Sequence, residues 1–187
     1  VATPILFKGQ GGADVFDGSL AAGPTTLLGG AGNDTLTGGA VDDIIIGGSG
    51  KDVVAGGAGD DRLDGRSGPD TLTGGSGNDT IRGGQGRDSL VGSQEADTLL
   101  GGGGRDTISG GEGSDRILGG GGRDLLDGDA GDDTLIGGPG ADDIAGGLGN
   151  DTLNGIFRDD AFNQVVGRDT LIGGNRPAGR PAPVITP

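Results

Sequence analysis

The sequence of 187 residues contains no Cys, Met, His, Trp or Tyr, and its only aromatic residues are four Phe. The lack of Cys excludes disulfides and thiol chemistry. No apolar run is long enough to cross a bilayer, so the sequence predicts no transmembrane helix. Its Ser residues have no base beside them, and its carboxylates recur identically instead of forming one special pair. These absences predict that the chain is not an enzyme.

Basic residues are also scarce, because 13 Lys and Arg face 28 Asp and Glu, for a formal net charge of −15. An acidic surface without stacking aromatics disfavours nucleic acid as a partner. Gly supplies 49 residues, which disfavours a helical core. The Gly residues are mostly adjacent pairs, which excludes the every-third-residue pattern of collagen. This composition is typical of disorder, but the order of the residues predicts a fold.

A nine-residue repeat runs without a gap through sixteen blocks, from Gly29 to Ile172. The sixth position is Asp in all sixteen blocks, and the eighth is always apolar. The first position is Gly in fifteen blocks and the fourth in thirteen. Two weaker blocks, 9–17 and 20–28, precede the regular array. A preference of Asp for turns does not explain this regularity, because Asn would satisfy it equally.

The unit G-G-x-G-x-D-x-U-x, in which U is aliphatic, resembles the RTX (hemolysin-type) calcium-binding nonapeptide. Blocks 74–82 (GGSGNDTIR) and 146–154 (GGLGNDTLN) match it at every defined position, and the resemblance extends over residues 9–172. It implies an all-β, right-handed parallel β-roll, which is a β-solenoid with two nonapeptides per coil. Two short-stranded sheets would enclose a thin aliphatic core.

The residues themselves agree with this fold. The GGxGxD half of each block has the composition of a turn, and the xUx half predicts a strand of about three residues with one side chain pointing inward. Two blocks then make one coil, so alternate Asp residues stack along two edges. The first edge would carry Asp34, Asp52, Asp70, Asp88, Asp106, Asp124, Asp142 and Asp160. The second would carry Asp43, Asp61, Asp79, Asp97, Asp115, Asp133, Asp151 and Asp169.

Columns of carboxylates about 5 Å apart repel one another and need neutralising. Calcium suits them better than magnesium, because it accepts six to eight oxygens, backbone carbonyls included. The resemblance implies that each ion binds carbonyls of positions two and four and the Asp of one turn. The corresponding turn of the next coil would add carbonyls of positions one and three and its own Asp. One such site would comprise Gly30, Gly32, Asp34, Gly47, Ser49 and Asp52.

Seven gaps on each edge allow fourteen calcium ions, and we expect nine good sites. Full occupancy would turn the net charge of −15 strongly positive, and several turns depart from the pattern. The departures are Val41, Ser93 with Glu95, residues 156–158, Gln164 and Val166. They make five gaps doubtful: Asp43–Asp61, Asp79–Asp97, Asp97–Asp115, Asp142–Asp160 and Asp151–Asp169. Asp14, which precedes Asp34 on the same edge, is expected to add one more site.

The ends of the array differ from its middle. We expect residues 1–8 to form a capping strand, residues 9–172 the calcium-binding roll, and residues 173–187 a Pro-rich flexible tail. All four aromatics lie near the ends of the array. Terminal repeats of a solenoid must cover an open core, which predicts capping by Phe7, Phe16, Phe157 and Phe162.

Two surface patterns suggest partners. Leu100, Leu118 and Ile136 occupy position nine on consecutive rungs, which predicts an outward aliphatic stripe for lateral self-association, unless they tuck under neighbouring turns. Position five is basic on the first edge and acidic on the second, and solvation explains both. The Thr residues at position seven are interrupted by Arg62 and Arg116, so β-propensity explains them better than ice binding.

The sequence therefore predicts a protein whose partner is the calcium ion and whose folding depends on it. The resemblance implies an extracellular or cell-surface location. Two roles remain open. A structural or surface protein is favoured because the array leaves no room in this chain for a separate active domain. The alternative is a calcium-triggered folding and secretion module of a larger secreted protein or toxin.

Overall fold

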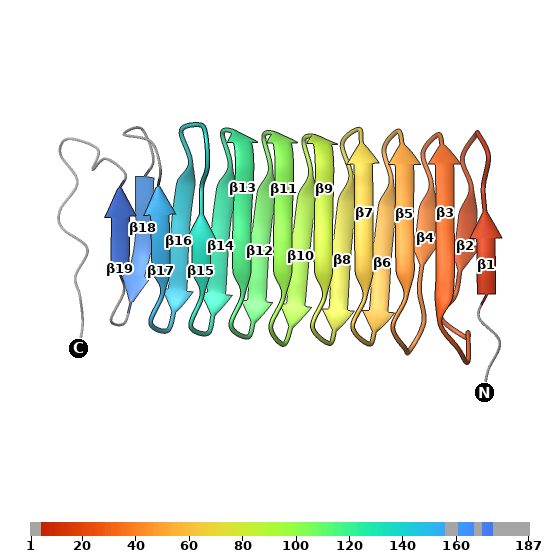
Figure 1. Ribbon diagram of the computed structural model, residues 1–187, viewed down its shortest axis with the longest axis horizontal. Helices are drawn as coiled ribbons and strands as arrows, with labels where there is room; N and C mark the ends of the chain where they lie inside the picture. The colour runs from red at the N-terminus through yellow and green to blue at the C-terminus, as the bar shows by residue number, and fades with distance from the viewer. Residues whose placement is uncertain (1–4, 156–160, 167–169, 174–187) are drawn as a thin grey trace.

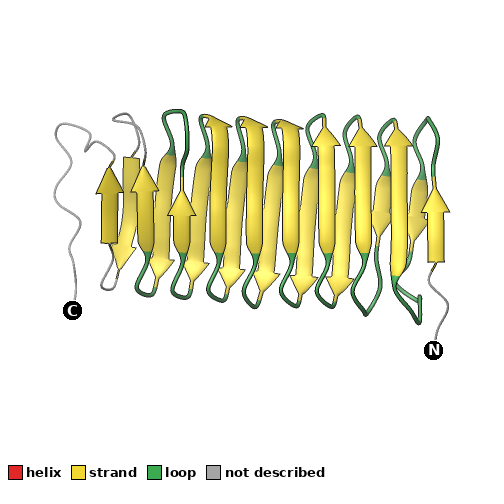
Figure 2. Ribbon diagram, viewed as in Figure 1, coloured by secondary structure: helices red, strands yellow, loops and turns green. Residues whose placement is uncertain are grey.

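The chain forms a solenoid of two parallel β-sheets (Figures 1 and 2). The computed structural model describes residues 5–155, 161–166 and 170–173. These residues contain strands and turns and no helix. The chain alternates between the sheets, so odd-numbered strands run one way in one sheet and even-numbered strands run the other way in the second (Figure 1). The predicted all-β β-roll is confirmed.

In the described residues, sheet A contains ten strands. They are β1 (Ile5–Lys8), β3 (Thr25–Ala31), β5 (Ile44–Ser49), β7 (Arg62–Ser67), β9 (Thr80–Gly86), β11 (Thr98–Gly104), β13 (Arg116–Gly122), β15 (Thr134–Ile136), β17 (Thr152–Gly155) and β19 (Thr170–Gly173). Sheet B contains nine. They are β2 (Val15–Asp17), β4 (Thr35–Thr37), β6 (Val53–Ala58), β8 (Thr71–Ser76), β10 (Ser89–Gln94), β12 (Thr107–Glu112), β14 (Leu125–Ala130), β16 (Asp143–Leu148) and β18 (Ala161–Val166).

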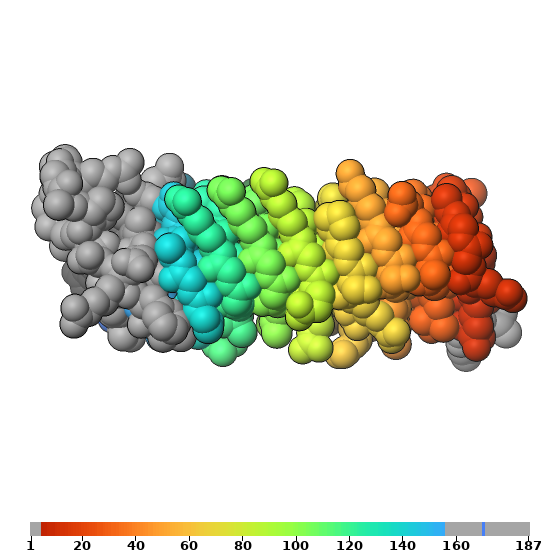
Figure 3. All heavy atoms as spheres, turned by 90° about the horizontal axis from the view of Figure 1, so that it is seen from above, coloured from red at the N-terminus to blue at the C-terminus, as the bar shows by residue number. Residues whose placement is uncertain are grey.

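Neighbouring strands pair in a register of one full coil, or two nonapeptides, as the repeat predicts. Leu90, for example, pairs with Leu72 on one side and with Ile108 on the other. The coils therefore stack as parallel rows along the long axis (Figure 3). Consecutive blocks alternate between the two sheets, so each block lies beside the block that is two repeats away in the sequence.

Most strands are longer than expected. A typical strand such as β8 has six residues, TLTGGS, and so includes positions one to three of the following block. The Gly pair that suggested a turn instead continues the ladder, and only positions four to six turn. Strands β4 and β15 keep three residues, and they precede the turns that contain Val41 and Pro139.

The core is one side chain deep. Position eight points inward from both sheets and is at most 1% exposed in each coil from Leu27 to Leu153. At the N-terminal end, Phe7 and Phe16 pack against this column, and their ring centroids lie 5.0 Å apart. Strand β1 pairs with β3 and forms the edge of sheet A. These contacts support the proposal of an N-terminal cap.

Candidate metal sites

Two ladders of Asp residues line the edges of the roll. On the first edge, the backbone N–H of Asp34 donates to Oδ1 of Asp52 at 2.9 Å, and that of Asp52 donates to Oδ1 of Asp70 at 2.8 Å. On the second edge, the N–H of Asp61 donates to Oδ1 of Asp79 in the same way. Each Asp thus fixes the turn one coil before its own. The ladders continue through Asp88, Asp106, Asp124 and Asp142 and through Asp43, Asp97, Asp115, Asp133 and Asp151.

The second carboxylate oxygen has no hydrogen-bond donor at most positions. Each ladder Asp from 34 to 151 is at most 2% exposed. Oδ2 is buried without a partner in Asp34, Asp52, Asp61, Asp70, Asp79, Asp88, Asp97, Asp106, Asp115, Asp124 and Asp133. A buried anionic oxygen without a partner is costly. Its repetition in coil after coil indicates a ligand that supplies positive charge.

Backbone carbonyls approach these orphaned oxygens. A Cβ added to Gly29 would overlap both Oδ2 of Asp34 and the carbonyl oxygen of Gly47, one coil further on. Gly at position one therefore leaves room where a carboxylate and a carbonyl converge. An oxygen-only donor set of this kind fits calcium.

The residues of the one site listed above lie in adjacent strands and turns. The N–H of Gly32 donates to the carbonyl of Ser49 at 2.7 Å, which joins the turns of Asp34 and Asp52. Gly30 lies in β3, and Gly47 and Ser49 lie in the neighbouring β5. In the described residues, no three acidic, His or Cys side chains form a metal-binding cluster. Any ion between the turns would therefore depend on carbonyls as well as on Asp.

A family model decides the assignment. The RTX calcium-binding nonapeptide repeat matches residues 19–54, 28–63, 55–90, 91–126 and 118–153. The chain belongs to this family. RTX repeats are calcium-binding structural repeats, and here they cover most of the chain. A comparison with curated proteins gives no match.

Burial raises the pKa of the ladder carboxylates of the RTX repeats from Asp52 to Asp133. Loss of hydration is the largest cause, the backbone hydrogen bond from the preceding coil opposes it, and the charges of neighbouring carboxylates add to it. The pKa reaches about 7 in Asp61, Asp70, Asp97 and Asp133. It reaches about 6 in Asp79, Asp88 and Asp124. Without a cation, these Asp residues thus bind protons at a higher pH in the folded roll than in the unfolded chain.

The turn at Val41 departs from the pattern, as predicted. Val41 does not adopt positive φ, which a β-branched residue resists. Oδ2 of Asp43 accepts the N–H of Gly39 at 2.6 Å, so this oxygen is already satisfied. The gap between Asp43 and Asp61 thus has one free carboxylate oxygen fewer than regular gaps.

The turn at Ser93 and Glu95 keeps the regular backbone in spite of its sequence. Both residues adopt positive φ, 101° and 66°. Oε2 of Glu95 accepts the N–H of Gly77 at 2.8 Å, and Oδ2 of Asp97 stays unpartnered. Arg66 and Asp129, at position two, also adopt positive φ. The departures from the repeat in this block therefore leave its backbone regular, and the occupancy of the gaps on either side of Asp97 remains a prediction.

A second ladder lies outside the first, and the sequence reasoning missed it. The N–H of Asp60 donates to Oδ1 of Asp42, and that of Asn78 donates to Oδ1 of Asp60. Two further pairs repeat the arrangement: the N–H of Lys51 donates to Oδ1 of Asn33, and that of Asn150 donates to Oδ1 of Asp132. These bonds run from the later coil to the earlier, opposite to the inner ladder. The frequent Asn and Asp at position five were the available signal.

Not every predicted residue belongs to the described part of the chain. Asp14 does lie on the first edge, because its N–H donates to Oδ1 of Asp34. Asp160, Asp169, Phe157 and the tail 174–187 lie outside the described residues. Phe162, Gln164 and Val166 belong to β18, of which the backbone alone is described.

Proposed function

We propose that this chain folds when calcium fills the gaps between its turns, and that it does so outside the cell. The column of buried, unpartnered Oδ2 atoms carries this proposal. Bound calcium would supply the positive charge that these oxygens lack. The residues that would hold it are the ladder Asp, with carbonyls of positions one to four in adjacent turns.

The metal-free chain has little else to hold it folded. Its core is a single column of aliphatic side chains, and acidic residues outnumber basic ones by 28 to 13. Burial of that column must offset the chain entropy of 49 Gly residues. A ligand that binds only the folded state stabilises it by mass action. Because each coil shares ligands with the next, binding should be cooperative.

The number of ions is proposed to lie between nine and fourteen. The turn at Val41 is the poorest candidate, because Gly39 already satisfies Oδ2 of Asp43. The backbone at Glu95 supports retention of the gaps on either side of Asp97.

We further propose a structural role at the cell surface, without catalysis. The carboxylates recur in one environment, and no His or Cys is present in the sequence. In the described residues, no helix is long and apolar enough to span a membrane. The second candidate is a calcium-triggered folding and secretion module of a larger secreted protein or toxin, and the calcium-binding repeats themselves are compatible with either role.

Far-UV circular dichroism during a calcium titration tests the folding proposal, with magnesium as the control. A cooperative transition from coil to β structure is expected with calcium and not with magnesium. A β signal that persists unchanged in chelator would show that the sites are dispensable. Light scattering then separates the two roles, because growth beyond small oligomers with calcium supports a structural assembly.

A further inference from the structure

The outer face of sheet A carries an ordered column of position-nine side chains. Strand pairing places them on consecutive rungs, from β3 to β13. Over these six rungs the column reads Leu28, Ile46, Asp64, Arg82, Leu100 and Leu118. It continues to Lys8 in β1 and to Ile136 in β15. Of the six, Arg82 is exposed and the other five are half-buried. Two apolar residues thus flank an acid and a base on each side.

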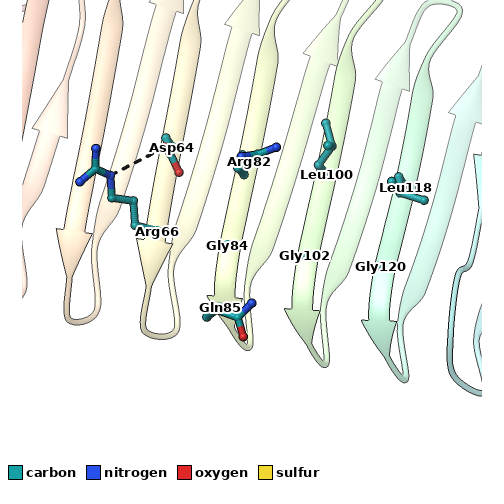
Figure 4. Close-up of a pocket in the computed structure, with 9 residues that line it drawn as sticks. All are labelled: Asp64, Arg66, Arg82, Gly84, Gln85, Leu100, Gly102, Leu118 and Gly120. Atoms are coloured by element: carbon teal, nitrogen blue, oxygen red, sulfur yellow. Dashed lines mark ion pairs between the residues drawn. The ribbon is translucent and has the colours of Figure 1, made fainter.

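A shallow groove follows this column (Figure 4). Its volume is about 510 Å³. It exists because position two is Gly in β9, β11 and β13, so no side chain stands beside Arg82, Leu100 and Leu118. Arg66 lines the groove at its β7 end, its side chain points away from Arg82, and its Nε lies 3.8 Å from Oδ2 of Asp64 (Figure 4). Arg82 has no ion-pair partner among the described residues, although Asp64 is its register neighbour.

We propose that this face binds a second copy of the chain across a two-fold axis. The axis would lie between β7 and β9 and run along the strands, so the two rolls would be antiparallel. A two-fold interface requires a surface that is complementary to itself. The column meets this requirement, because rotation places Asp64 against the partner copy's position 82. It likewise places Ile46 opposite position 100 and Leu28 opposite position 118. One rung further out, the exposed Lys8 would face position 136 at the rim of the contact, where its ammonium group keeps its water.

The neighbouring columns fit the same axis. At position seven, no like charges would oppose each other across the axis. The facing pairs, one residue from each copy, would be Arg62 with Thr80, Ile44 with Thr98 and Thr26 with Arg116. At position two, the side chain of Arg66 would face Gly84 in the groove of the other copy. Ile44, which is 45% exposed, would be covered.

Charge fixes the register of the two rolls. A slide of one coil in one direction would place Asp64 against Asp64, and a slide in the other would place Arg82 against Arg82. A slide of two coils toward the C-terminal end would place Arg82 against Leu100 and desolvate it. Like-charge juxtaposition and unpaired charge exclude these alternatives. Six strands spaced about 4.8 Å apart and about 20 Å long bury roughly 1,100 Å² in total, at the weak end of specific interfaces.

Sedimentation velocity of the calcium-loaded chain tests this interface, which rests on the folding proposed above. The wild type should shift from monomer to dimer as its concentration rises through the micromolar range. The Arg82→Asp variant should stay monomeric up to a protein concentration at least tenfold higher, because Asp64 of one copy then faces an acidic residue of the other. The exchange Asp64→Arg with Arg82→Asp should restore the dimer. Arg105→Asp, with the same charge change on the exposed first edge, should dimerise as the wild type does.

The readings separate this proposal from the folding proposal. Circular dichroism with calcium measures whether each variant folds. If the wild type does not fold with calcium, that result contradicts the folding proposal and not the dimer interface. A folded wild type that stays monomeric at all concentrations would overturn the dimer. So would a failure of the charge exchange to restore it while Arg105→Asp still dimerises.

Cross-linking tests the register independently and does not depend on Arg82→Asp folding. The chain has no native Cys, so single thiols are unambiguous. A mixture of Ile46→Cys and Leu100→Cys chains should link through a short thiol-specific reagent. Leu100→Cys alone should not, because position 100 faces position 46. Equal linking in both samples would overturn the proposed axis.

Discussion

The turns before Asp43 and Asp97 lie on the same edge, and both lack Gly at position four, yet they fold differently. Glu95 adopts positive φ and preserves the regular turn, whereas Val41 does not. A Cβ on Gly113 would meet the carbonyl oxygen of Glu95, as in regular coils. A Cβ on Gly59 would instead meet the Val41 carbonyl carbon and the next amide nitrogen.

The difference lies in what each side chain offers the backbone. A left-handed conformation costs a residue with a Cβ about 1–2 kcal/mol, and branching at Cβ makes it harder still. Glu95 offsets this cost with its bond to the N–H of Gly77. Val41 has no polar atom to do so, and the N–H of Gly39 turns to Oδ2 of Asp43. Both turns contain the ladder Asp, so the residue at position four determines whether Oδ2 of that Asp stays without a hydrogen-bond donor.

A change of pH should have the largest effect on the stability of the regular turns, because protons bind to many carboxylates at once. The raised pKa values mean that the folded, metal-free roll binds more protons than the unfolded chain, so its stability falls as pH rises from about 4 toward 7. In chelator, β structure measured by circular dichroism should therefore be greater at pH 5 than at pH 8. With calcium the order should reverse, since protons compete for the same oxygens. A metal-free β signal that grows with pH would contradict this.

Asp→Asn changes at the two turns should have effects of opposite sign on stability in chelator and of the same sign in calcium. Asp97→Asn removes a charged ligand, so it should destabilise the calcium-loaded roll by about 3 kcal/mol. In chelator it should stabilise the roll, because it removes a buried unpaired charge. Asp43→Asn should destabilise the roll in both conditions. The single amide oxygen of Asn cannot replace both carboxylate oxygens, which accept the N–H groups of Thr25 and Gly39. Urea unfolding with calcium and with chelator measures all four values, and equal effects of the two variants would refute the distinction.

Glu95→Val should convert the regular turn into the irregular one. It adds the conformational cost of a β-branched residue and removes the bond to Gly77, for a loss of about 2 kcal/mol in calcium. Thermal unfolding monitors the loss, and Glu95→Gly is the matched control that should retain most of the stability. A Glu95→Val chain as stable as the Gly variant would show that position four tolerates any residue.

Val41→Gly should repair the irregular turn, with the smallest effect on stability. The gain should be about 1 kcal/mol, since Gly also increases the entropy of the unfolded chain. Isothermal titration calorimetry should find one more calcium ion per chain than in the wild type. Val41→Ala, which keeps a Cβ without branching, should gain less, and an unchanged ion count in the Gly variant would leave Val41 without a role in binding.

The repeat alone predicted the sheets, the register, the core column and both Asp ladders, because position six and position eight never vary. It also singled out Val41 correctly. The strand length was underestimated, since Gly-Gly was interpreted as a turn although positions one to three continue the ladder in strands such as β8. The retained turn at Glu95 was not foreseen, because its rescue depends on an N–H in the preceding coil. The outer ladder of Asp42 and Asp60 required the three-dimensional stacking of the coils.

The hydrogen bonds between coils make the roll behave as a one-dimensional chain with nearest-neighbour coupling. The N–H of each ladder Asp is satisfied by the carboxylate of the next coil, so a coil is complete only when its successor is in place. In such a system, the position of a defect determines how many coils it uncouples. Val41 lies between β4 and β5, near the N-terminal end, where an interruption separates few coils from the rest. The same defect at position 95 would divide the solenoid near its middle and broaden its unfolding transition.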